Sequence, residues 1–227
     1  MRSQWRKTKT NKSRVPGPVC FAAGRSFFHK VNTMKRKSKP KERFTKDQRV
    51  ALHEAGHATM AWIRQTRIGW VSINPADFQT NENCLGMCCH PINRKFFEDV
   101  ELDRSDATLH KIEVQLQITL AGVVTEAIWT GRHDWVGAQS DLETCNELWF
   151  RWWEGSEDVW VAHRKYLLAK VRDELSRARN RQLVKVLADA LVQRRRLSGK
   201  QVRAVICDEF QRQYDEHRER IAAAKKP

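Results

Sequence analysis

A histidine, a glutamate and a second histidine lie close together in the sequence His53-Glu54-Ala55-Gly56-His57. If this segment is helical, positions i and i+4 share one face, so both imidazoles can reach the same metal ion. Zinc lowers the pKa of a coordinated water to about 7, and a neighbouring carboxylate can take the proton as the water attacks a peptide carbonyl. The motif therefore predicts a zinc-dependent peptidase site, with His53 and His57 as ligands and Glu54 as general base and acid.

The residues around the motif favour a helix over about residues 46–65. Thr45 followed by Gln48 is a capping-box pattern, and apolar residues recur at helical spacing after it. Gly56 costs about 1 kcal/mol relative to Ala inside a helix, which suggests that another part of the chain approaches it closely. Because short motifs also arise by chance, this context is needed to support the metal site.

A catalytic zinc usually takes a third protein ligand, and the residue types alone leave six candidates open. The candidates are His110, Glu126, Asp134, Asp141, Glu143 and Glu147. Spacing along the chain does not choose between them. Each also has an ordinary explanation, as for Asp141, which would be stabilised by the dipole of a helix if it lies in the first turn.

The remaining patterns predict a mainly helical domain of the α+β class, with a small sheet or hairpin beside the His-Glu-x-x-His helix. Alternating residues predict two strands, at 68–74 and 85–90. Helical periodicity and capping signals predict helices at 106–129 (closed by Gly131), 140–153 (capped by Ser140 with Glu143), 158–178, 180–194 and 198–223. Six tryptophans are interpreted as core or interface packing residues, namely Trp129, Trp135, Trp149, Trp152, Trp153 and Trp160.

The net charge of +15 belongs to one end of the chain. Residues 1–46 contain 15 Lys or Arg and a single acid, Glu42, so the rest is nearly neutral. Such a segment cannot bury enough apolar surface to fold alone. We expect a basic, disordered tail at 1–43 that could contact polyanions non-specifically, a peptidase domain at 44–210, and a helix end or tail at 211–227. No apolar run is long enough for a membrane span.

Six cysteines are scattered along the chain without the paired Cys-x-x-Cys spacing of a structural zinc site. The sequence shows no secretion signal, so we expect reduced thiols and a cytoplasmic location. Cys84, Cys88, Cys89 and His90 could together bind a metal. However, adjacent side chains of a strand point to opposite faces, which makes Cys88 and Cys89 poor partners for one ion.

Five segments carry a resemblance to a known family. They are His53–Ala58 (His-Glu-Ala-Gly-His-Ala), Leu85–Pro91, Leu120–Gly131 (Leu-Ala-Gly-Val-Val-Thr-Glu-Ala-Ile-Trp-Thr-Gly), Gly137–Leu142 (Gly-Ala-Gln-Ser-Asp-Leu) and Leu187–Val205. Together they resemble the peptidase domain of the FtsH family of ATP-dependent zinc proteases, over about residues 44–210. The resemblance implies a helical, zincin-like metallopeptidase fold that binds one zinc ion.

The resemblance also assigns roles to individual residues. It makes Asp141 the third zinc ligand and gives Glu126 a supporting role behind the ligands. It further implies that a strand in the cleft wall pairs with an extended, unfolded substrate. The residues of that wall are Leu85, Gly86, Met87, Cys88 and Cys89.

The chain departs from the family because we find no Gly-x-x-x-x-Gly-Lys-Ser/Thr phosphate loop and no membrane anchor in it. The segments 78–83 and 93–104 are also unlike the family's sequence. We therefore expect a peptidase that acts on peptides or unfolded segments by itself, or that uses an ATPase partner in trans. The ring assemblies of the family suggest a homo-oligomer. The alternatives are a zinc-stabilised adaptor that kept the fold but lost catalysis, which an intact Glu54 disfavours, and a nucleic-acid binder that would rely on the tail.

Overall fold

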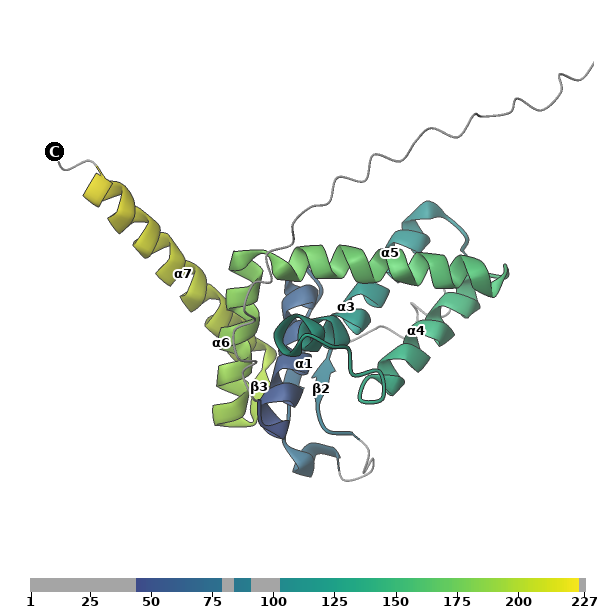
Figure 1. The fold of residues 1–227 in the computed structure, drawn as a ribbon, viewed down its shortest axis with the longest axis horizontal. Coiled ribbons are helices and arrows are strands. Elements are labelled where there is room, and N and C mark those ends of the chain that lie inside the picture. Colours follow the sequence, from purple (N-terminus) through teal and green to yellow (C-terminus); the bar gives the residue numbers. More distant parts are fainter. Residues whose placement is uncertain (1–43, 79–83, 91–102, 225–227) are drawn as a thin grey trace, which may run out of the picture. The chain divides into compact units, whose positions relative to one another are not determined.

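The computed structural model describes residues 44–78, 84–90 and 103–224, which belong to one compact unit. The predicted basic tail at 1–43 lies outside the described residues. The elements in chain order (Figure 1) are α1 (Lys46–Ile63), β1 (Trp70–Ser72), the short 3-10 helix η1 (Pro75–Phe78), β2 (Met87–Cys89), α3 (Asp106–Thr130), α4 (Gln139–Trp152), α5 (Glu157–Ser176), α6 (Ala178–Arg194), β3 (Arg196–Ser198) and α7 (Gly199–Ala224). The predicted fold class, mainly helical with a small sheet, is confirmed.

Helix α1 begins as its sequence predicts. The side chain of Thr45 accepts a hydrogen bond from the Gln48 backbone, and the Gln48 side chain accepts one from the Thr45 backbone, so the capping box is complete. Apart from His53, every residue from Ala51 to Ala61 is buried. The helix is therefore held on several sides, which fixes the side chains of the motif.

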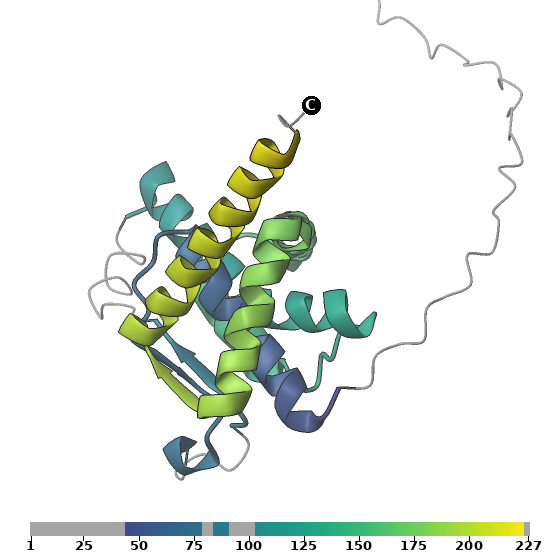
Figure 2. The same ribbon diagram turned by 90° about the vertical axis from the view of Figure 1, so that its left-hand side faces the viewer.

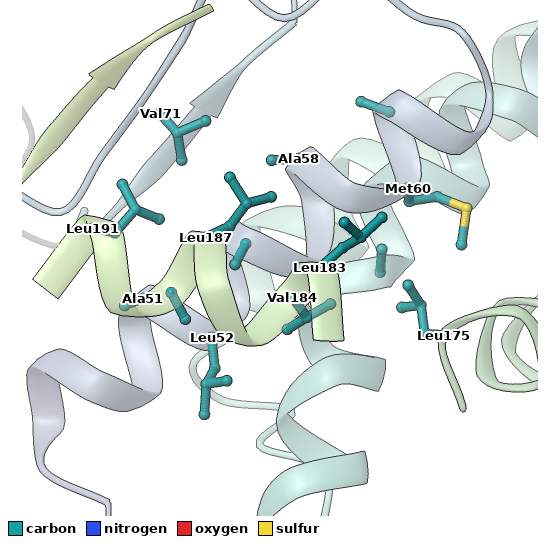
Figure 3. Packing of buried hydrophobic residues seen from close by; sticks show 14 of the residues in the cluster. Ala51, Leu52, Ala58, Met60, Val71, Leu175, Leu183, Val184, Leu187 and Leu191 are labelled. Carbon is teal, nitrogen blue, oxygen red and sulfur yellow. The ribbon is translucent and has the colours of Figure 1, made fainter. Parts of the chain in front are cut away.

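The main hydrophobic core joins α1 to α3, α6 and the sheet. Figure 3 shows part of it, including Ala51, Ala58, Leu183, Leu187 and Leu191. The three leucines of α6 are almost fully buried, and each contributes about 1.5–3 kcal/mol by leaving water. Small alanines on α1 allow the neighbouring helices to approach it closely.

The sheet has three short antiparallel strands in the order β2-β1-β3. Strands β1 and β2 are the two predicted strands, although each is only three residues long. Strand β3 was not predicted, because it contains a single buried apolar residue, Leu197, between polar neighbours. In the part of the chain that the structure describes, β2 pairs with β1 alone and so forms one edge of the sheet beside α1.

A second cluster lies between α3, α4 and α5 and is rich in aromatic rings. Trp149 stacks on Trp160 with ring centroids 5.1 Å apart, and both are buried. The packing interpretation of these tryptophans is confirmed. Trp135 is 43% exposed in the loop between α3 and α4, where it stacks on His133, so it is not a core residue.

Helix α7 packs against α6 and the sheet at its start and continues through residues 211–224 as exposed helix. Figure 1 shows this last part extending away from the other helices, and Figure 2 shows its tip beyond them. No helix within the described ranges is both long and apolar enough to cross a membrane. The five cysteines of the described residues are unpaired.

Candidate metal centre

Helix α1 brings the two histidines and the glutamate of the motif together. The rings of His53 and His57 lie with their centroids 4.7 Å apart. Potential ligand atoms of His53, Glu54 and His57 all lie within 4.8 Å of one another. Glu54 and His57 are only 5% and 6% exposed. These three residues form a group that could hold a metal ion.

Helix α3 packs its backbone directly against the imidazoles at Gly122. A Cβ atom at this position would lie 2.4 Å from His53 Nε2 and 2.5 Å from His57 Nε2. Gly56 allows the same close crossing from the other side, since a Cβ there would lie 2.7 Å from the Ala121 carbonyl oxygen. The expectation that another part of the chain approaches Gly56 is confirmed. The two glycines together set how deeply the imidazoles sit against α3.

The orientation of His57 is fixed from α3. Its Nδ1 donates a hydrogen bond of 2.7 Å to the buried carbonyl oxygen of Ile118, which leaves Nε2 facing the centre. On the other imidazole, Nδ1 of His53 lies 3.9 Å from Glu126 Oε2. This distance suits an ion pair and is too long for a hydrogen bond. Glu126 therefore lies behind His53, where partners that orient metal ligands are found.

Asp141 reaches the histidines from α4, which is remote in the sequence. Its Oδ2 lies 3.0 Å from His53 Nε2 and 3.3 Å from His57 Nε2. Asp141 occupies the first turn of α4, which begins at Gln139 after an Ala138 N-cap without a side-chain hydrogen bond. The capping box predicted for Ser140 and Glu143 was wrong, because Glu143 accepts a hydrogen bond from Gln139 instead.

The other candidates for a third ligand lie elsewhere. Glu143 and Glu147 are on the exposed face of α4, where Glu147 pairs with Arg151. Asp134 is half-exposed and faces Arg49, and His110 is exposed near the start of α3. Of the six candidates, Asp141 alone lies within 3.5 Å of both imidazoles in the described residues.

The charges of the centre favour positive charge at the imidazole nitrogens. Burial lowers the pKa of His53, but Asp141, Glu126 and Glu54 outweigh it and raise the pKa to about 10. Burial opposes the charge on Asp141, but both imidazoles hold the pKa of this carboxyl well below its usual range. Burial raises the pKa of Glu54, although the imidazoles partly offset the shift. Three carboxylates around two imidazoles thus create a local preference for a cation.

The segment leading into β2 forms a wall next to Glu54. A Cβ atom at Gly86 would lie 2.6 Å from Glu54 Oε1, so the Gly86 backbone passes directly beside the carboxylate. Leu85 and Met87, on either side of it, are 46% and 42% exposed. The structure thus places the predicted wall beside the motif, with Gly86 as the contact point.

Cys88 and Cys89 of the same segment belong to β2. Burial, together with the charge of Glu54, raises the pKa of the Cys88 thiol well above its usual value. In the residues that the structure describes, the only group of metal-ligand side chains is the one on α1. The alternative of a cysteine-rich metal site therefore gains no support.

Sequence reasoning missed two contributors to the centre. The role of Gly122 had a signal, because a glycine within an apolar helical run suggests a close contact. The Ile118 carbonyl that orients His57 left no signal in the sequence, because every residue type carries a main-chain carbonyl oxygen. Comparison with known protein families finds no family that matches the chain, and comparison with curated proteins finds no match either.

Proposed function

We propose that this chain is a zinc metalloendopeptidase that hydrolyses peptide bonds in unfolded proteins or peptides, similar to the peptidase domain of the FtsH family. The observation that carries the proposal is the approach of Asp141 to both imidazoles of the motif, with Glu54 beside them. In a motif that arose by chance, we would not expect a carboxylate 88 residues away in the sequence to lie beside both histidines.

The residues fit zinc on three points. Two imidazoles and one carboxylate form a donor set that zinc takes in catalytic sites, whereas magnesium and calcium prefer oxygen ligands alone. The buried Glu54 Oε2 has no hydrogen-bond partner among the described residues. A side chain at Gly122 would fill the space beside the imidazoles. In this proposal His53, His57 and Asp141 hold the ion.

Glu54 performs the proton transfers of the proposed reaction. When bound, zinc polarises a carbonyl and lowers the pKa of a coordinated water to about 7. Glu54 Oε2 takes one proton from the attacking water as its oxygen bonds to the peptide carbon. The carboxyl group then delivers this proton to the nitrogen as the carbon–nitrogen bond breaks. The raised pKa of Glu54, caused mainly by burial, brings its basicity closer to that required near neutral pH.

Strand β2 supports the choice of an extended polypeptide as substrate. Among the described residues its outer edge is not paired with another strand, and a peptide in extended conformation can add there by main-chain hydrogen bonds. Such a peptide would run past Gly86, next to Glu54. Most strands of a folded protein are already paired within a sheet, so unfolded segments are the preferred class. An ATPase partner and a homo-oligomer, suggested by resemblance alone, remain predictions.

The test compares cleavage of casein by the wild type and by Glu54→Gln, with zinc content measured in both. Glu54→Gln retains the size of the side chain and removes the base, so cleavage should fall by about 100-fold or more while zinc is retained. Equal cleavage by both proteins would contradict the role of Glu54. Zinc binding without cleavage by either would favour the adaptor alternative.

A further inference from the structure

The loop between α3 and α4 must place Asp141 accurately, although α4 lacks the usual support at its start. Its N-cap residue is Ala138, whose side chain accepts no hydrogen bond. Side-chain caps normally satisfy the first free N–H groups of a helix and fix the direction in which it leaves the preceding loop. The direction in which α4 leaves the loop must therefore depend on contacts within the loop itself.

Asp134 makes two such contacts, with the residues just before the helix. Its backbone carbonyl accepts a hydrogen bond of 3.2 Å from the Ala138 N–H, and its Oδ1 accepts one of 3.1 Å from the Gly137 N–H. The fit is close, since a Cβ atom at Gly137 would lie 3.3 Å from the Asp134 carboxyl carbon. The loop is folded around this aspartate just before α4 begins.

The second oxygen of Asp134 connects the loop to the motif helix. Asp134 Oδ2 lies 3.9 Å from Nη1 of Arg49. Arg49 precedes His53 by four residues and so shares its face of α1. Asp134 thus bonds to the segment that leads to Asp141 with one oxygen and faces the helix of the histidines with the other.

We propose that Asp134 is a positioning residue, which sets the location of Asp141 relative to His53 and His57 through the contact with Arg49. The inference rests on the proposed metal site. Metal ligands must be held within about 0.5 Å of the productive geometry by the groups around them. Loss of the link leaves the three ligands in the protein but lets α4 drift, so it affects zinc affinity and ligand geometry more than folding.

The experiment measures the zinc dissociation constant of the full chain by competition with a chelator, and the visible absorption of the cobalt(II)-loaded protein, which reports ligand geometry. Asp134→Ala should weaken zinc binding about tenfold and change the cobalt spectrum. Asp134→Asn retains Oδ1 as a hydrogen-bond acceptor, so its zinc affinity should fall less than that of Asp134→Ala. The matched control is Asp173→Ala, which removes another exposed aspartate paired with an arginine, Arg177, and should change neither.

A double-mutant cycle with Arg49→Met isolates the link. Arg49 and Asp134 act through one contact. The loss of zinc affinity in the double variant should therefore be smaller than the product of the losses in the two single variants. Unchanged zinc binding in Asp134→Ala, or fully multiplicative effects, would overturn the inference. If Asp134→Ala does not fold, Asp134→Asn takes its place in the cycle. Asp141→Ala distinguishes a failure of the metal site from a failure of the positioning role. Unchanged zinc affinity in Asp141→Ala would contradict the metal site itself.

Discussion

Replacement of Gly122 with Ala tests whether α3 sets the position of the imidazoles. The new methyl carbon would lie 2.4 Å from His53 Nε2, whereas ordinary contact begins at 3.4 Å. The imidazoles or α3 must therefore move by about 1 Å. We expect zinc affinity to fall by about 10- to 100-fold. The free energy of unfolding should fall by only about 0–2 kcal/mol, because a gain in helix propensity partly offsets the overpacking.

The assay is competition with a chelator of known zinc affinity, together with thermal unfolding of the zinc-free protein. Gly155→Ala is the matched control, because its methyl carbon would lie 2.1 Å from Trp153 Nε1 in the loop between α4 and α5. It should lower stability and leave zinc affinity unchanged. If Gly122→Ala binds zinc as tightly as the wild type, the imidazoles do not depend on this contact and the reasoning is refuted.

Four further predictions concern the pH dependence of zinc binding and three other positions. Burial lowers the pKa of His53, but the neighbouring carboxylates raise it to about 10, so zinc must displace a proton at neutral pH. The affinity from chelator competition should rise at least about tenfold per pH unit and level off above pH of about 10; a flat profile would contradict the charge arrangement. Glu126→Gln should weaken zinc about tenfold in the same assay if the carboxylate supports His53. Gly86→Ala directs a methyl group at Glu54, so kcat for peptide cleavage should fall about tenfold or more while zinc affinity stays constant. Trp149→Ala should lower the free energy of unfolding in urea by about 3–5 kcal/mol without changing zinc affinity, since it empties part of the second cluster.

The helices were predictable because their signals are local. Thr45 and Gln48 mark the start of α1, and Gly131, with a φ of 80°, closes α3 where a glycine was expected. Strand β3 was not predictable in this way. It is stabilised by pairing with β1, a contact between residues more than 100 positions apart that leaves no periodic pattern in three residues.

The site was predictable to the extent that it lies on one helix. The i, i+4 spacing of His53 and His57 required only that α1 be helical. The approach of Asp141 depends on the crossing of α1 with α3 and on the path of the next loop, so the residue types left six candidates open. Resemblance alone indicated Asp141. The structure places it beside both imidazoles, and its role as a zinc ligand stays a prediction.

The most direct test of the proposed peptidase is zinc stoichiometry with add-back. The purified chain should bind about one zinc per molecule, lose casein cleavage on chelation and recover it when zinc is returned. Asp141→Ala and His57→Ala should bind zinc at least about tenfold more weakly. The variant that binds zinc more weakly should also lose more of its cleavage activity. A chain that binds no zinc, or that cleaves casein equally well after chelation, would contradict the metal centre on which the proposed function depends.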